Sequence, residues 1–139
     1  MSARISKKTM SETATAGTIG VIVSHAELAA ALVDAVRTIS GVADALHSVS
    51  NEGCDPKALV ARIETAIGGR PAVLFVDLPG GSCLSSAIRL ARGRGELAVV
   101  TGVNLAMLLD FVFHRDLPPA EAAQRAVEAG SRAIRTPAA

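Results

Sequence analysis

Residues 18–28 read TIGVIVSHAEL and contain a short apolar segment, Ile19–Val23, that is rich in β-branched residues. A run of this kind, without polar interruption, is typical of a strand buried on both faces of a parallel sheet. The run stops at Ser24-His25, and apolar residues then recur at helical spacing from Ala26 to Ile39. In doubly wound α/β folds, ligands bind at the carboxyl ends of such strands. His25 is therefore the first candidate functional residue.

The rest of the chain repeats this alternation of strand and helix. Further strands are predicted at 42–50, 72–76 and 96–100, and helices begin at Asp55-Pro56, at Cys83 and after Asn104. Spacing of about 30 residues between strands indicates an α/β fold with a doubly wound, mainly parallel sheet and helices on both faces. We expect the runs 19–23, 72–76 and 97–100 to be the most buried segments. The more polar run 42–50, which contains His47, is expected at a sheet edge.

The C-terminal part is predicted to hold one more helix and a short strand. Pro118-Pro119 starts the helix, Gly130 is a plausible C′ residue after its end, and residues 131–136 are predicted to add the strand. His114 is expected in the last turn of the preceding helix, where a cation favours the helix dipole.

Length and composition indicate a single domain preceded by a tail. The 139 residues suit one core. We divide them into a polar N-terminal tail, 1–16, expected to be disordered, and a folded domain, 17–139. No apolar run approaches the roughly 20 residues needed to span a bilayer, and no secretory apolar region is found, which favours the cytoplasm.

Charge, aromatic content and cysteine spacing limit the kinds of ligand and partner that this chain is expected to bind. The net charge of +1 and the three Phe, with no Trp or Tyr, argue against nucleic-acid binding. Cys54 and Cys83 lack a CxxC spacing and cannot form a zinc site alone. We therefore expect neither a metal nor a cofactor.

Polar residues follow three of the predicted strands. His25 ends the first strand, Asp77 ends the third and Asn104 follows the fourth. Because the carboxyl ends of parallel strands share one edge, His25 and Asp77 can be neighbours although they are far apart in sequence. Beside them, Gly80-Gly81-Ser82 opens a helix, and a helix N-terminus favours an anion.

This combination suits nucleophilic chemistry on a phosphoryl group. A neutral histidine can attack phosphorus through one ring nitrogen, while Asp77 holds the proton on the other. Ser82 and the amides of Gly80 and Gly81 would neutralise the phosphoryl oxygens. Ser24 and Asn104 are expected to support the site.

Three motifs carry a resemblance to a known family. IGVIVSH, FVDLPGGS and TGVNLAML occur in that order, and the region from Thr18 to the C-terminus resembles the mannose-type IIA component of the bacterial phosphoenolpyruvate-dependent sugar phosphotransferase system. The resemblance implies that His25 is phosphorylated by the carrier protein HPr, with Asp77 on the other ring nitrogen and Ser82 near the phosphoryl oxygens. It also implies transfer to a IIB component for sugar uptake, and a homodimer in which the C-terminal strand is exchanged.

The chain departs from the family pattern around this site. Ala26 replaces the usual glycine after the histidine, and Pro79 replaces a frequent aromatic residue. Cys83 and Ala106 stand where the family commonly has proline. The residues expected to perform the chemistry are kept, whereas these four residues around the site differ. We therefore expect phosphorylation to be retained and docking to a standard IIB to be weakened.

Other functions remain open on the sequence. A regulatory phosphoprotein of the same family would signal its phosphorylation state without transport, and the phosphoryl donor subunit of dihydroxyacetone kinase also has a strand-end Ser-His motif. A Ser-His-Asp hydrolase using Ser82 would need a G-x-S-x-G elbow, and the glycine after the serine is missing. A phosphoaspartate receiver fails because Ser24-His25 supplies no acidic residues for magnesium.

Overall fold

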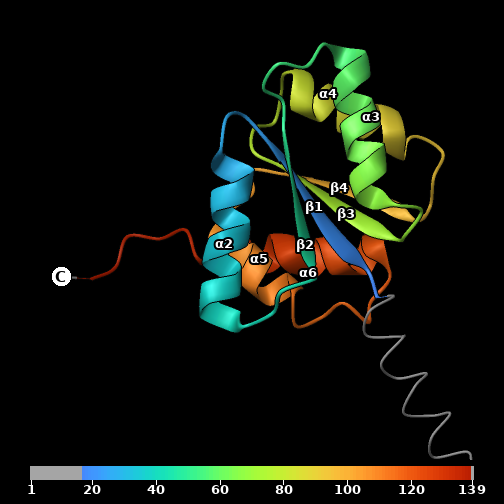
Figure 1. Ribbon diagram of the computed structural model, residues 1–139. Coiled ribbons are helices and arrows are strands. Elements are labelled where there is room, and N and C mark those ends of the chain that lie inside the picture. The colour runs from blue at the N-terminus through green and yellow to red at the C-terminus, as the bar shows by residue number, and fades with distance from the viewer. Residues whose placement is uncertain (1–16, 139) are drawn as a thin grey trace, which may run out of the picture.

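A wholly parallel, four-stranded sheet in the order β2-β1-β3-β4 forms the middle layer (Figure 1). The computed structural model describes residues 17–138, so the predicted tail, 1–16, lies outside the described residues. The strands are β1 Ile19–Ser24, β2 Leu46–Ser50, β3 Ala72–Val76 and β4 Leu97–Thr101. The helices are α2 Leu28–Ser40, α3 Pro56–Ile67, α4 Ser82–Ala91, α5 Leu105–Phe111 and α6 Pro119–Arg132.

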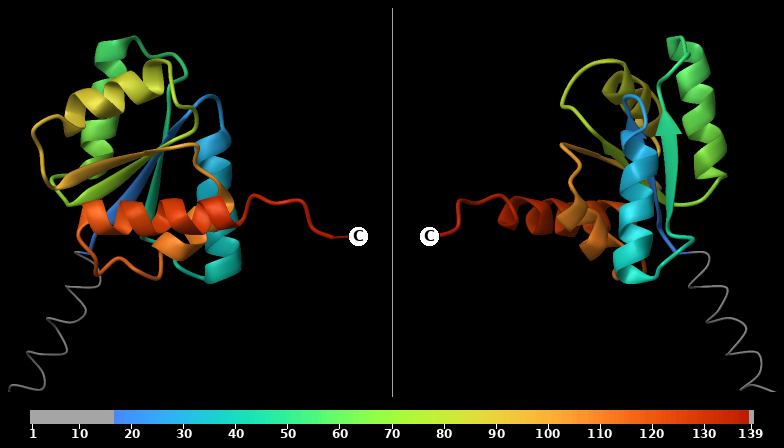
Figure 2. Two further views of the ribbon diagram at one scale, coloured as in Figure 1. Left: turned by 180° about the vertical axis from the view of Figure 1, so that it is seen from behind. Right: turned by 60° about the vertical axis from the view of Figure 1, so that its left-hand side comes forward.

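Helices cover both faces of this sheet, as predicted. α3 and α4 lie on one face, and α2, α5 and α6 lie on the other (Figures 1 and 2). Alternate residues of β1 serve the two layers: Ile22 packs with the α2, α5 and α6 side, whereas Val21 and Val23 pack with α3 and α4. Among the helices of residues 17–138, none combines the length and apolar character needed to cross a membrane.

The two central strands are the most buried part of the chain. Every residue of β1 and of β3 is buried, which confirms the predictions for 19–23 and 72–76. The prediction for 97–100 is only partly right, because Ala98 and Val99 of β4 remain half-buried. The cause is topological, since β4 and β2 are the edge strands and each has a neighbour on one side only. The edge position predicted for β2 is confirmed.

Two predictions for the C-terminal helices are wrong at their ends. α5 ends at Phe111, so His114 lies beyond it, and its Nδ1 lies 2.7 Å from the Asp110 carbonyl oxygen. Gly130 does not follow α6 but is buried inside it. A Cβ atom there would come within 2.7 Å of Met107 Cε, so the glycine is required by the close packing of α6 on α5.

The strand expected over 131–136 is not formed in this chain. α6 continues to Arg132, and the N–H groups of Ala133 and Ile134 donate back to the carbonyls of Gly130 and Ser131. The following residues lead away from the sheet and never reach its β4 edge (Figure 1). A strand needs a neighbouring strand for its backbone hydrogen bonds, and this chain offers residues 133–138 none.

Candidate active site

The register of the central strands brings His25 and Asp77 together. Val23 of β1 lies opposite Val76 of β3, so the residues that follow these strands leave the sheet side by side. The Asp77 N–H donates to the Val23 carbonyl at 3.3 Å and fixes the second loop against the first. The prediction that these two side chains share one edge of the sheet is confirmed.

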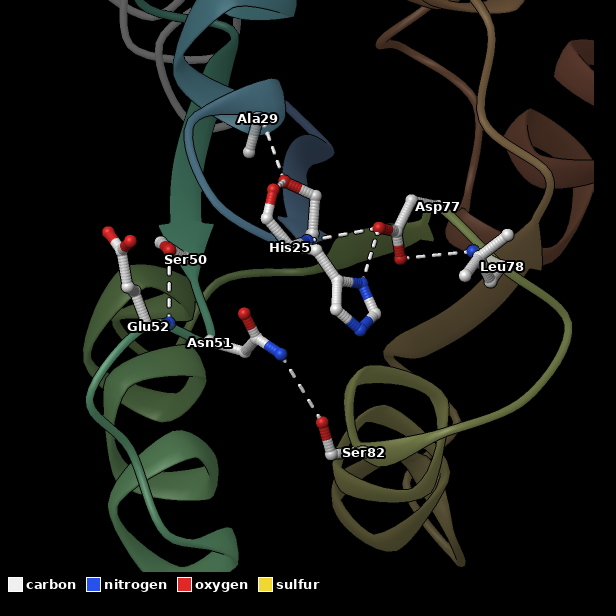
Figure 3. A network of polar contacts seen from close by, with 9 residues as sticks. His25, Ala29, Ser50, Asn51, Glu52, Asp77, Leu78 and Ser82 are labelled. Atoms are coloured by element: carbon white, nitrogen blue, oxygen red, sulfur yellow. Dashed lines mark hydrogen bonds and ion pairs between the residues drawn. The ribbon is translucent and has the colours of Figure 1, made fainter.

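Asp77 holds His25 through two contacts to one carboxylate oxygen (Figure 3). His25 Nδ1 lies 2.8 Å from Asp77 Oδ2, and the backbone N–H of His25 donates to the same oxygen at 3.0 Å. The other carboxylate oxygen accepts the N–H of Leu78 at 3.0 Å. With Asp77 as acceptor, the neutral imidazole carries its proton on Nδ1 and keeps a lone pair on Nε2.

The exposure of the two side chains matches these roles. The Asp77 side chain is 8% exposed, whereas that of His25 is 48% exposed. In Figure 3 the second ring nitrogen of His25 points away from Asp77 and in the direction of Ser82. An anchored carboxylate therefore lies behind an accessible ring nitrogen.

The hydrogen bonds around Asp77 also set its protonation. Burial by itself would raise the pKa of this carboxyl group, but the hydrogen bonds from the backbone and ring of His25 and from Leu78 outweigh it. The pKa of Asp77 therefore lies below its ordinary value. The group is a carboxylate at neutral pH, as an imidazole gaining positive charge requires.

Ser24 supports the turn from β1 into α2. Its side chain is buried, and Ser24 Oγ accepts the N–H of Ala29 at 2.7 Å, which satisfies one of the free donors at the start of the helix. α2 begins at Leu28 rather than at the predicted Ala26, because Ala26 adopts φ of 51° in the left-handed region. The turn thus has a backbone conformation that favours glycine.

Gly80 and Gly81 lead into α4 across an open surface. Gly81 has φ of 88° and ψ of −170°, and α4 begins at Ser82, one residue earlier than predicted. A Cβ atom at either glycine would meet nothing within 4 Å, so no side chain stands between solvent and this helix N-terminus. The first N–H groups of an α-helix lack intrahelical partners and carry partial positive charge. The predicted anion cradle is therefore sterically open.

Asn51 is a site residue that the sequence reasoning missed. Ser24 pairs with Ser50 in the sheet register, so Asn51 leaves β2 beside the β1 loop. Its Nδ2 lies 3.5 Å from Ser82 Oγ, and its backbone N–H donates to the Ser24 carbonyl at 3.0 Å. The available signal was its place directly after a predicted strand, the same signal that identified His25.

Asn104, expected to support the site, makes its side-chain hydrogen bonds to α5 and α6. Its Oδ1 accepts the N–H of Met107 at 3.0 Å, which confirms the predicted cap of α5. Its Nδ2 donates to the Gly130 carbonyl at 3.1 Å and so ties α5 to α6. Its amide oxygen is thus engaged by α5 and its amide nitrogen by α6.

Cys83 lies behind the pair, at the start of α4. Its Sγ, a ring nitrogen of His25 and a carboxylate oxygen of Asp77 all lie within 4.8 Å of one another, a separation that could in principle hold a metal ion. Burial, aided by the negative charge of Asp77, raises the pKa of the fully buried thiol. Metal ligation needs the thiolate, and His25 Nδ1 is already hydrogen-bonded to Asp77, so these donors fit a proton-holding pair better than a metal centre.

The remaining histidines lie outside this arrangement. His47 is on β2, where burial and the positive charge of Arg70 lower its pKa. His114 contacts Asp110, with its Nδ1 3.6 Å from Asp110 Oδ1. Within residues 17–138, His25 is thus the histidine that combines exposure with a buried carboxylate partner.

Comparisons with solved structures identify the same architecture in sugar phosphotransferase components. The phosphotransferase system component EIIA from Streptococcus agalactiae superposes with a TM-score of 0.78 at 16% identity, over 86% of this chain and 96% of that one. The mannose/sorbose-specific IIA subunit from Enterococcus faecalis gives 0.76 at 22% identity, over 88% and 96%. The IIA protein associated with the fucose utilization operon of Streptococcus pneumoniae gives 0.73 at 16% identity, over 86% and 93%. At these identities the likeness establishes the fold.

The family itself is established by sequence. No curated protein matches the chain significantly. The family model that describes the fructose IIA component of the phosphotransferase system, EIIA-man, matches residues 20–128. This range contains β1 from its second residue on, with His25 after it, and the loop after β3 with Asp77. Because the match covers well over half of the sequence, this chain belongs to the EIIA-man family of phosphotransferase system IIA components.

Proposed function

We propose that the protein is a phosphoryl carrier that accepts a phosphoryl group from HPr on His25 Nε2 and passes it to a IIB component for sugar uptake. One observation carries the proposal: the buried Asp77 carboxylate lies 2.8 Å from His25 Nδ1, while the ring is half exposed. A histidine anchored in this way presents a single ring nitrogen to a partner. Membership of a family of sugar phosphotransferase components supports the assignment.

The chemistry is a reversible displacement at phosphorus. The Nε2 lone pair of neutral His25 forms the N–P bond while the bond from phosphorus to the donor's leaving atom breaks, and that atom retains the bonding electrons. The ring becomes positively charged with its proton still on Nδ1, and the Asp77 carboxylate balances that charge. Transfer to the acceptor runs the same step in reverse and restores the lone pair on Nε2.

The α4 N-terminus is proposed as the cradle for the phosphoryl oxygens. Gly80 and Gly81 leave it sterically open, and the Ser82 hydroxyl is exposed beside it. The helix contributes free N–H donors and a favourable dipole at low entropic cost, because the donors are already oriented. A hydrolase would need Ser82 Oγ hydrogen-bonded to His25 Nε2. Among the described residues Ser82 Oγ instead contacts Asn51 Nδ2, at 3.5 Å.

We further propose a homodimer acting in the cytoplasm, where HPr and the IIB component would meet it. The outer edge of β4 has no neighbour within the described chain, and Ile134, in the segment after α6, is 76% exposed. A second copy could supply the missing strand with its own residues after Arg132, which would bury Ile134 and pair the edge. Sedimentation analysis of the full chain and of a chain ending at Arg132 tests this, with a dimer expected only for the former.

Reconstitution tests the carrier function directly. The purified chain is incubated with phosphoenolpyruvate, enzyme I and HPr, and intact mass is followed. A single acid-labile, base-stable phosphoryl group should appear on the wild type and on the His47→Ala and His114→Ala variants. The label should be absent from His25→Ala, and a IIB component should accept it from the phosphorylated wild type. Labelling that persists in His25→Ala would refute the proposal.

A further inference from the structure

Asn51 lies across the His25 ring from Asp77. In Figure 3 the Asp77 carboxylate approaches the ring from one side, and the Asn51 amide points from the other side toward Ser82. The two flanking residues come from different strands, since Asp77 follows β3 and Asn51 follows β2. The free ring nitrogen thus has polar groups on both flanks.

The backbone of Asn51 is fixed by its surroundings. Its N–H donates to the Ser24 carbonyl at 3.0 Å, and its carbonyl accepts the N–H of Cys54 at 3.1 Å. The next residue is held as well, because the Glu52 N–H donates to Ser50 Oγ at 3.1 Å. The asparagine amide is therefore presented from a rigid turn, the preorganisation that a binding group needs.

Arg62 of α3 reinforces this turn from outside the site. Its Nη1 donates to the carbonyls of Ser50 and Glu52, each at 3.2 Å. These two carbonyls flank Asn51 in sequence, so one guanidinium nitrogen clamps the backbone on both sides of it. These two hydrogen bonds hold the backbone on both sides of Asn51 in place.

The amide has donor capacity to spare. Asn51 Nδ2 carries two hydrogens, and its contact to Ser82 Oγ, at 3.5 Å, is at the long limit for a hydrogen bond. In that contact Ser82 Oγ is the acceptor, which leaves the serine hydroxyl hydrogen free for another acceptor. Asn51 and Ser82 thus form a pair of donors beside the same open space.

We propose that Asn51 binds the phosphoryl group directly, so that Asn51 and Ser82 donate hydrogen bonds to its oxygens on the side opposite Asp77. This inference rests on the proposed phosphorylation of His25. A phosphoryl group on Nε2 brings three strong acceptor oxygens and a charge near −2. An amide donates to these oxygens without the strong attraction of a lysine or arginine, which suits a group that must be released again.

A small chemical donor isolates this role from protein docking. Wild type, Asn51→Ala and Asn51→Asp are incubated with phosphoramidate, and the rate of phosphohistidine formation is followed by intact mass. Loss of one donor to a charged group should slow Asn51→Ala roughly tenfold to hundredfold. Asn51→Asp should be slower still, because its carboxylate repels the incoming anion. Glu52→Ala is the matched control, since its side chain points away from the ring (Figure 3), and its rate should stay within about twofold of wild type.

A titration distinguishes direct contact from a merely structural role. Phosphorus NMR of the phosphorylated protein reports the second ionisation of the phosphoryl group, and removing a donor to the dianion should raise that pKa in Asn51→Ala. If Asn51→Ala fails to fold, Asn51→Asp, which keeps the size of the side chain, carries the test. Unchanged rate and titration in a labelled Asn51→Ala protein would overturn the role of Asn51 and leave the carrier function intact. Absence of label on wild-type His25 would overturn the carrier function itself.

Discussion

Asp77 Oδ2 accepts both the side chain and the backbone of His25, at 2.8 Å and 3.0 Å. One carboxylate oxygen therefore fixes the direction of the ring, its tautomer and the start of the loop after β1. The Leu78 N–H holds the other oxygen, so the carboxylate cannot turn freely. Charge, tautomer and orientation at His25 all depend on a single residue of the neighbouring strand.

Replacing Asp77 should therefore slow phosphotransfer without unfolding the protein. Asp77→Ala removes a charge-assisted hydrogen bond, a loss of about 1.5–3 kcal/mol, which corresponds to roughly one to two orders of magnitude in rate. Asp77→Asn keeps the size of the side chain but loses its charge, so its phosphotransfer rate should lie between those of wild type and Asp77→Ala. Initial rates of labelling with HPr as donor check this. Equal rates in all three would reduce Asp77 to a turn residue.

The lowered pKa of Asp77 predicts how the stability of the protein responds to acid. A carboxyl group whose folded-state pKa is depressed stabilises the fold above its unfolded pKa, about 3.9. That contribution is lost as pH falls through the lower folded value. The free energy of unfolding of wild type should exceed that of Asp77→Asn at neutral pH, and the gap should shrink below about pH 4. Urea unfolding at several pH values measures it, and a constant gap would contradict the mechanism.

The sequence predicted best where local pattern and topology agree. The runs 19–23 and 72–76 are buried because they are central strands, and the parallel topology alone brings His25 to Asp77 across 52 positions. Asn51 was missed because its side chain acquires partners only through the β1–β2 register. Gly130 was misassigned because only the contact of α6 with Met107 explains it. A C-terminal strand cannot be decided from one chain, since strands require a neighbour.

Ala26→Gly should stabilise the protein. Ala26 has φ of 51°, where a side chain costs about 1–2 kcal/mol relative to the right-handed region. Glycine removes that strain but loses more entropy on folding, so a net gain of about 0.5–1 kcal/mol is expected. Ala31→Gly, on the exposed side of α2, is the control and should instead destabilise by about 0.5–1 kcal/mol. Chemical denaturation compares them, and a loss of stability in Ala26→Gly would show that the turn carries no strain.

Gly130→Ala should destabilise the packing of α6 on α5. The added Cβ would lie 2.7 Å from Met107 Cε and 3.1 Å from Asn104 Oδ1, so side chains must shift. Such overpacking costs about 1–3 kcal/mol. At Gly95 a Cβ meets nothing within 4 Å, and Gly95→Ala should be close to neutral. Thermal unfolding of both variants tests the contrast, which would vanish if α6 were loosely packed.

Leu78 is expected to act in docking the phosphoryl donor and not in the chemistry. Its side chain is 54% exposed beside Asp77, while its contribution to the Asp77 carboxylate comes from the backbone N–H, which Leu78→Ala retains. An exposed apolar side chain next to a site can serve as an anchor for a protein partner. Leu78→Ala should therefore raise the KM for HPr by roughly tenfold, a loss of about 1.4 kcal/mol in binding. The rate with phosphoramidate, which needs no docking surface, should stay unchanged.

Ile39→Ala is the matched control for this docking role. Ile39 is 62% exposed and lies toward the far end of α2, about 17 Å along the helix from the residue nearest the site, so neither donor should distinguish this variant from wild type. A Leu78→Ala protein that loses activity equally with HPr and with phosphoramidate would place Leu78 in the chemistry. A Leu78→Ala protein that keeps full activity with both donors would show that HPr docks on other residues around the site.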